Sequence, residues 1–143
     1  MLQMPQSVYR QLRQHGEAAY PHECCGVLLG TVTAHAKFVI RAIPVENSST
    51  GNTRSHYQIA SLDLIRIDRE GRQTDLEILG FYHSHPDHPA HWSPTDLTEA
   101  HWFGCSYIIT SVDKGKAAIT NSFELIGTEE SDKHFVDEKI DIE

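Results

Sequence analysis

The sequence lacks any long apolar run. No stretch of its 143 residues approaches the roughly 18 consecutive apolar residues that a membrane-spanning helix needs. The first residues, MLQMPQSVYRQL, contain no apolar core of the kind that a secretory signal carries. These absences predict a protein without a membrane partner and without a secretory leader.

Cysteine is scarce, with three residues, of which Cys24 and Cys25 are adjacent. An odd number without a secretory signal predicts reduced thiols and a cytoplasmic location rather than a disulfide framework. The adjacent pair is not spaced as zinc ligands are, and neighbouring side chains on a strand point to opposite faces. Cys25 is therefore more typical of a small buried core residue than of a nucleophile.

Positive charge is also in short supply, with 12 lysines and arginines against 20 acidic residues and a net charge of -8. A protein that binds nucleic acid needs a basic face, so this balance argues against such a partner. Eight acidic and only two basic residues lie in 124–143, which leaves the rest of the chain nearly neutral. We expect one domain over 1–126 and an acidic tail over 127–143, either a surface helix or partly disordered.

Hydrophobic periodicity predicts helices alternating with strands. Predicted helices cover 5–20 and 61–70, with Ser61 as a cap, and a further helix starts at Ser93. The other predicted elements are strands at 24–30, 37–45, 76–85, 107–112 and 117–126 (the last two a hairpin), a brief strand at 56–59 and a polar loop at 46–54. Three aromatic residues are expected in the core rather than on a binding platform: Trp102, Phe103 and Tyr107.

The most informative segment is HSHPDHPAHWSPTD, over residues 83–96. His83 and His85 stand two apart at the end of a predicted strand, so the period of two places both imidazoles on one face. The Ser-Pro pair is typical of a helix start, and that helix carries Asp96 in its first turn. Two histidines and a carboxylate make three corners of a tetrahedron and leave the fourth corner for water, as catalytic zinc requires.

Each of these residues also has an interpretation without a metal. Two histidines two apart are often a surface feature, and an aspartate in a first helical turn favours the helix dipole anyway. His88 and His91 are alternative ligands in the intervening loop, where a fixed geometry is harder to hold. Ser93 either caps its helix or steadies an oxyanion, and it could serve both roles. Glu23 is either a solvated carboxylate at a strand entrance or the general base of a zinc hydrolase.

Taken together, these residues resemble the JAMM motif of the MPN+ (Mov34/JAB) zinc metalloproteases. That motif has a distant glutamate, then H-x-H-P, six residues, and S-x-x-D, and it matches Glu23, His83 to Pro86 and Ser93 to Asp96. HECCGVLLG resembles the first strand of the family, while EILGFYHSHPDHPA and SYIITSV resemble its small bacterial standalone members. The resemblance covers about residues 5–126.

The resemblance implies one zinc ion per chain, bound by His83, His85 and Asp96. It implies that Glu23 takes a proton from the attacking water and passes it to the leaving amine, and that Ser93 stabilises the oxyanion. The implied reaction is hydrolysis of a peptide or isopeptide bond at the C-terminus of a ubiquitin-like protein, in small bacterial members a sulfur carrier. The chain has no room for the long insertions of the eukaryotic deubiquitinating members, which disfavours polyubiquitin as the substrate.

The resemblance also implies a mixed α/β (α+β) fold, in which helices flank a curved, largely antiparallel sheet with zinc at one edge. Two other functions stay open at this point. One is a scaffold domain without activity, which the intact ligand set disfavours. The other is a zinc hydrolase of a small amide, which the motif alone does not distinguish from a peptidase. The sequence does not indicate the oligomeric state.

Overall fold

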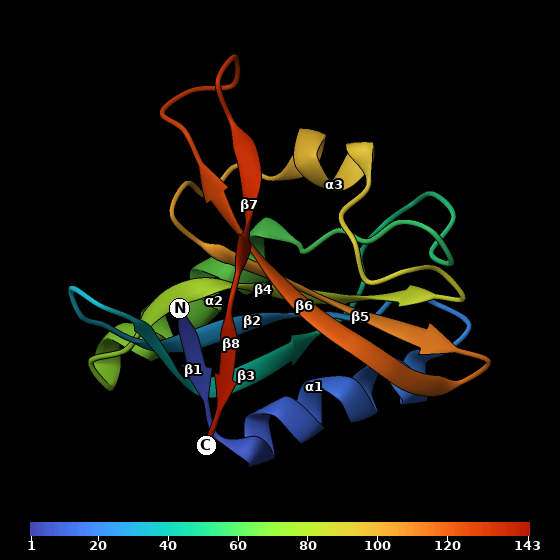
Figure 1. Ribbon diagram of the computed structural model, residues 1–143, viewed down its shortest axis with the longest axis horizontal. Helices are drawn as coiled ribbons and strands as arrows, with labels where there is room; N and C mark the ends of the chain where they lie inside the picture. Colours follow the sequence, from blue (N-terminus) through green and yellow to red (C-terminus); the bar gives the residue numbers. More distant parts are fainter.

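A single eight-stranded sheet organises the structure, a computed structural model that describes residues 1–143 (Figure 1). Three helices flank this sheet, and none of them is long and apolar enough to cross a membrane. The elements are β1 (Leu2–Met4), α1 (Gln6–Ala19), β2 (Cys25–Val32), β3 (Lys37–Val45), α2 (Ser61–Gln73), β4 (Glu77–Pro86), α3 (Pro94–Glu99), β5 (Ser106–Asp113), β6 (Lys116–Ile126), β7 (His134–Glu138) and β8 (Ile140–Ile142).

The strand order across the sheet is β7-β6-β5-β4-β2-β3-β1-β8. Three neighbouring pairs are parallel, namely β4 with β5, β3 with β1, and β1 with β8, and the other four are antiparallel. The predicted mixed fold with a curved sheet and flanking helices is confirmed, and so is the hairpin of β5 and β6. Strand β4 lies in the middle of the sheet, so its backbone is held from both sides.

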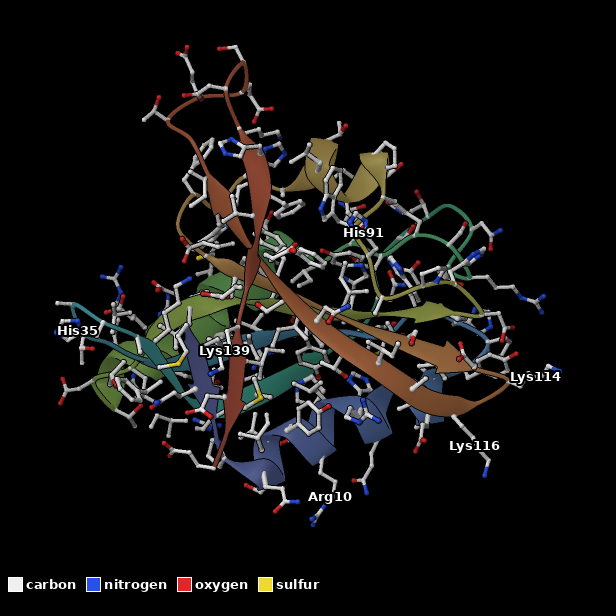
Figure 2. The ribbon with its side chains drawn as sticks, in the orientation of Figure 1. Arg10, His35, His91, Lys114, Lys116 and Lys139 are labelled. Atoms are coloured by element: carbon white, nitrogen blue, oxygen red, sulfur yellow. The ribbon has the colours of Figure 1, made fainter.

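The sheet nearly closes on itself because its two edge strands are consecutive in the chain. Only Lys139 separates β7, which pairs with β6, from β8, which pairs with β1 (Figures 1 and 2). The expectation of a surface helix or a partly disordered tail is therefore wrong. The segment has few apolar residues, and it is ordered by pairing with strands that are distant in the sequence.

A half-buried lysine ties the strands across the line of closure. The ammonium of Lys37, on β3, donates to Ser106 Oγ at 2.9 Å and to carboxylate oxygens of Glu124 at 2.8 Å and Glu138 at 3.3 Å. The side chain of Glu138 is 4% exposed, so its charge would be costly without this partner. Four strands thus meet at a single cation.

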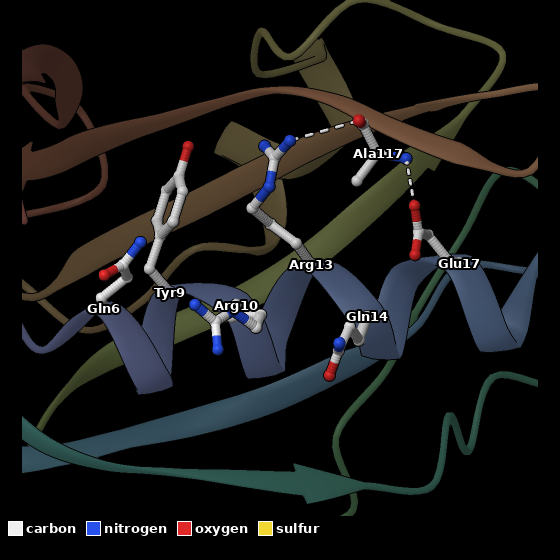
Figure 3. A pocket seen from close by; sticks show the side chains of 7 residues that line it. All are labelled: Gln6, Tyr9, Arg10, Arg13, Gln14, Glu17 and Ala117. Carbon is white, nitrogen blue, oxygen red and sulfur yellow. Dashed lines mark hydrogen bonds between the residues drawn. The ribbon is translucent and has the colours of Figure 1, made fainter.

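Two clusters of buried side chains cover opposite faces of the sheet, and Cys24 and Cys25 fall into different clusters as predicted. Helix α1 buries Val8 and Leu12, the predicted i, i+4 pair. The same helix also binds the N-terminal part of β6, which does not pair with β7. Arg13 donates to the carbonyl of Ala117, and Glu17 accepts from the N–H of the same residue (Figure 3).

Two local predictions are wrong. Ser61 does not cap α2, because the N-cap is Ala60 and no side chain there accepts a backbone N–H. The brief strand expected at 56–59 is extended chain without a strand partner. The side chain of Asn47 organises this segment instead, accepting from the N–H of Gln58 and donating to the carbonyl of His56.

The ring of Tyr82, on β4, occupies the space above Gly26, on β2. A Cβ at Gly26 would lie 2.1 Å from a carbon of that ring, which is far inside van der Waals contact. The hydroxyl of Tyr82 lies 2.7 Å from Nδ1 of His15, so the ring is also held at its far end. Glycine at position 26 therefore lets β4 keep its place beside β2.

We predict that Gly26→Ala destabilises the protein by about 1–3 kcal/mol, because the added methyl group overpacks a filled site. Urea denaturation of the purified variants measures this difference. Gly51→Ala is the matched control, since the nearest atom to its Cβ is 3.7 Å away, and it should change the free energy of unfolding by less than about 0.5 kcal/mol. Equal stability of the two variants would contradict this description of the Tyr82 packing.

Candidate metal centre

The two histidines of the predicted motif lie together at the end of β4. His83 and His85 are both buried, and their Nε2 atoms are 3.1 Å apart. Backbone pairing fixes the register, since His83 stands opposite Cys25 on β2 and opposite Ile109 on β5. The period of two therefore places both rings on one face, as predicted.

Helix α3 brings the carboxylate of Asp96 to the same place. Ser93 is the N-cap, and its Oγ accepts from the N–H of Asp96 at 3.1 Å. Asp96 Oδ2 in turn accepts from the N–H of Ser93 at 2.9 Å, which completes a capping box. The predicted helix start is confirmed, and the capping box fixes the direction of the Asp96 side chain.

The three donor groups have separations that suit one metal ion. Asp96 Oδ2 is 3.2 Å from His85 Nε2, and Asp96 Oδ1 is 3.4 Å from His83 Nε2. A tetrahedral ion with bonds of about 2.0–2.1 Å has ligand atoms about 3.3 Å apart. The observed separations match this value, so His83, His85 and Asp96 could hold a metal.

The protonation states of Asp96 and His83 suit a metal site. For His85, burial lowers the pKa, but hydrogen bonds with Asp96 and Pro89 outweigh that effect and raise it. Burial raises the pKa of Asp96, but hydrogen bonds from His83 and His85 outweigh that effect and lower the pKa well below its usual value. Burial lowers the pKa of His83, against the opposing influence of Asp96. An ionised carboxylate and a neutral imidazole are the forms that bind metals.

Each histidine is oriented by a contact outside the donor group. Nδ1 of His85 lies 2.8 Å from the carbonyl oxygen of Pro89, to which it can only donate, and this contact turns Nε2 of the ring toward Asp96. The ring of His83 stacks on Tyr57 with centroids 4.3 Å apart. Nδ1 of His83 is buried without a hydrogen-bond partner, so outside the donor group this ring is held by packing.

Glu23 faces the same site from the start of β2. Its backbone is fixed by the 46–60 loop, because its N–H donates to the carbonyl of Thr53 and its carbonyl accepts from Asn47. Its side chain lines a cavity of about 370 Å³ together with His85, Ser93 and Asp96 among others. Burial raises the pKa of Glu23 to about 8.

The histidines of the loop lie outside the donor group. His88 and His91 line the cavity beside Glu23 but do not converge with the three donors. The ring of His91 stacks on Trp92 with centroids 5.2 Å apart (Figure 2). The structure thus brings Glu23 and Ser93 to the donor group and leaves His88 and His91 at the wall of the cavity.

A second cavity, of about 310 Å³, is also lined by Asp96. Its lining is largely apolar and includes Tyr57, Leu64, Phe81, Trp102 and Tyr107. Tyr107 is buried, as predicted for a core residue, but Trp102 is 40% exposed, so its assignment to the core is wrong. Phe103 is 38% exposed and is not a core residue either.

Sequence reasoning missed the contacts that the 46–60 loop makes with the site. Tyr57 stacks on His83, and Nε2 of His56 lies 2.7 Å from Oε1 of Glu99, at the end of α3. The loop is polar and without periodicity, so its sequence carries no pattern that indicates these contacts. They depend on the tertiary placement of Asn47, Tyr57 and α3.

The family model described as prokaryotic homologues of the JAB domain matches residues 5–125. The chain belongs to this prokaryotic JAB family. It is 33% identical over 107 residues to a protein of Haloferax volcanii named desampylase, with 75% of each chain covered. It is 31% identical over 120 residues to a Thermus thermophilus protein named probable TtuB-protein conjugate cleaving protease, covering 82% of this chain and 74% of that protein.

A solved structure supports the same fold assignment. The JAB1/MPN domain protein of Archaeoglobus fulgidus superposes with a TM-score of 0.59, covering 98% of this chain and 97% of that chain. Sequence identity is 14%, so the likeness concerns the fold alone. This JAB-family chain therefore has the predicted JAB/MPN-like fold.

We predict that a divalent transition metal stabilises the metal-free protein, by about 2.7 kcal/mol at 100 times its Kd. Thermal unfolding with and without added metal measures this effect. The increase should be lost in His83→Ala and Asp96→Asn, and it should be retained in the control His35→Ala, whose exposed side chain lies in the loop between β2 and β3 (Figure 2). An undiminished increase in His83→Ala would place the metal elsewhere.

Proposed function

We propose that this protein is a zinc-dependent peptidase or isopeptidase that cleaves an amide bond at the C-terminus of a ubiquitin-like sulfur-carrier protein. The observation that carries the proposal is the meeting of three metal-donor groups with a buried glutamate and a serine hydroxyl. Glu23, His85, Ser93 and Asp96 line one cavity, and His83 completes the donor group. Such a set is what metal-assisted amide hydrolysis requires.

In this proposal His83, His85 and Asp96 hold one zinc ion per chain. Bound zinc supplies a Lewis acid that polarises the scissile carbonyl and lowers the pKa of water to about 7. The ionised carboxylate of Asp96 and the neutral ring of His83 are in the forms that act as ligands. The remaining chemistry falls to two residues of the chain, Glu23 and Ser93.

Glu23 acts as the general base and then as the general acid. Its carboxylate takes a proton from the attacking water as the water oxygen bonds to the carbonyl carbon, and it gives that proton to the leaving nitrogen as the C–N bond breaks. The products are a carboxylic acid and an amine. The carboxylate of Glu23 lines the cavity together with His85, Ser93 and Asp96, which places it where this transfer takes place.

Ser93 serves as cap and as oxyanion donor at once. Its Oγ accepts from the N–H of Asp96, which uses a lone pair and leaves the hydroxyl hydrogen free. That hydrogen donates to the carbonyl oxygen of the substrate as negative charge develops there. The two roles of Ser93 are compatible in this arrangement because they use different parts of one hydroxyl group.

The two cavities support a peptide-like substrate rather than a small amide. Asp96 lines both of them, one with mostly apolar and the other with mostly polar lining residues, so the space beside the donor group exceeds what a small amide needs. In the extended segment beside the apolar cavity, the backbone groups of Tyr57 and Ile59 have no hydrogen-bond partner in the protein. The names of the two relatives, which refer to protein conjugates or their cleavage, support the same class of substrate.

Two alternatives are weaker. A scaffold domain has no need of a converged donor group, whereas here three donors meet with the separations of a tetrahedral site. A hydrolase of a small amide would leave one of the two cavities without a role. We also propose the cytoplasm as the compartment, because the three cysteines are free thiols, two of them buried.

We predict that Glu23→Gln lowers the rate of conjugate cleavage by at least about 100-fold, the lower end of what general acid-base catalysis contributes. TtuB-protein conjugates are a suitable substrate, with cleavage followed on gels after zinc loading. Glu46→Gln is the control, because Glu46 is exposed in the loop after β3, and it should cleave at the wild-type rate.

Zinc content is measured in the same samples. Glu23→Gln should keep its zinc, because Glu23 is not one of the three donors. Unchanged cleavage by Glu23→Gln would contradict its role as the base. Faster cleavage of small amides than of the conjugate by the wild-type protein would favour the small-amide hydrolase.

A further inference from the structure

Helix α3 carries Asp96, and its contacts with the rest of the protein include the pair of His56 with Glu99 and the packing of Leu97 on the core. It is six residues long, and none of its residues is buried. Isolated helices shorter than about 12–15 residues are marginal in water, so α3 depends on contacts from outside itself. The capping box fixes the first turn of the helix. Because both of its hydrogen bonds join residues of the same turn, it does not fix the helix relative to β4.

Lys133, between β6 and β7, binds the C-terminal end of α3. Its ammonium donates to the carbonyl of Thr98 at 3.0 Å and to the carbonyl of Ala100 at 2.9 Å. The third acceptor is Oε2 of Glu130, at 2.7 Å. All three N–H groups of the ammonium are thus used, although the side chain is only 6% exposed. A cation at this end also interacts favourably with the helix dipole.

Phe135 contacts the chain just before α3. It stands two residues after Lys133, and its ring packs against Trp92, with centroids 5.6 Å apart. Trp92 immediately precedes the N-cap Ser93. Phe135 is itself fixed in the core by Tyr107 and Phe123. The segment that runs into β7 therefore holds both ends of α3, which lies beside it in Figure 1.

The turn that precedes Lys133 fixes the position of this residue. Gly127 has a φ of 125°, and a Cβ there would lie 2.9 Å from the Cα of Lys133, so the two backbones approach closely. Asp132 Oδ1 accepts from the N–H groups of Thr128 and Glu129 at 3.0 and 2.8 Å. These bonds fix the loop within which Lys133 is placed.

We propose that Lys133 and Phe135 are positioning residues of the metal centre. By holding the two ends of α3 they keep the carboxylate of Asp96 at ligand distance from His83 and His85. The acidic C-terminal segment thereby contributes to metal binding without supplying a ligand. This inference rests on the proposed zinc site, and the experiment below separates its failure from the failure of that site.

The test measures zinc affinity of the full-length protein by competition with a chromogenic chelator. Lys133→Met keeps the aliphatic stem and removes the three donors. We expect it to weaken zinc binding by about 10-fold, the lower end of what loss of a group bonded directly to a metal ligand causes, because Lys133 acts on Asp96 only through α3. Lys139→Met is the matched control, because Lys139 is an exposed lysine of the same segment (Figure 2). It should bind zinc as the wild type does.

A second readout separates positioning from general destabilisation. In the Co²⁺-loaded proteins the visible absorption bands report ligand geometry, so Lys133→Met should shift them or reduce their intensity at saturating metal, and Lys139→Met should not. Phe135→Leu weakens the contact with Trp92 without removing a charge. It replaces Lys133→Met as the test variant if Lys133→Met does not fold. It should weaken zinc binding by a smaller factor.

The outcomes are distinct. A wild-type protein that binds no zinc would refute the metal centre itself. A wild type that binds zinc, with Lys133→Met or a folded Phe135→Leu matching it in affinity and in the Co²⁺ spectrum, would overturn only the positioning role. Weaker binding with changed bands in Lys133→Met, against an unchanged Lys139→Met, is the result that the proposal expects.

Discussion

The main constraint on this structure is the close approach of three lone-pair donor groups, whose nitrogen and oxygen atoms lie 3.1–3.4 Å from one another. His83, His85 and Asp96 are largely withdrawn from water, and such groups are stable together only when protons or a cation lie between them. Burial favours the neutral form of His83, and the carboxylate stays ionised. A single divalent cation could satisfy all three groups at once, and several parts of the fold converge on this point.

Segments distant in the sequence supply the rigidity that this point needs. The central position of β4 fixes the two histidines, and the 46–60 loop adds the stack of Tyr57 on His83 and the backbone contacts of Glu23. The C-terminal segment closes the sheet and binds α3 through Lys133. A functional site held in this way keeps its geometry even though its carboxylate stands on a short helix.

The sequence predicted the local parts of the site well, because those parts follow short-range rules. The period of two placed His83 and His85 on one face, and the start of α3 followed from the pair Ser93 and Pro94. The roles of Glu23 and Ser93 stay predictions. The strands β7 and β8 and the exposure of Trp102 depend on distant pairing and packing, which periodicity does not report. Tyr57 and Lys133 went unnoticed for the same reason.

The most direct test of the metal centre is a crystal structure of the zinc-loaded protein, with anomalous diffraction recorded on both sides of the zinc absorption edge. The account predicts one strong peak per chain, about 2.0–2.1 Å from Nε2 of His83, from Nε2 of His85 and from a carboxylate oxygen of Asp96. Zinc bound only at other residues, with these three side chains still hydrogen-bonded to one another, would contradict it.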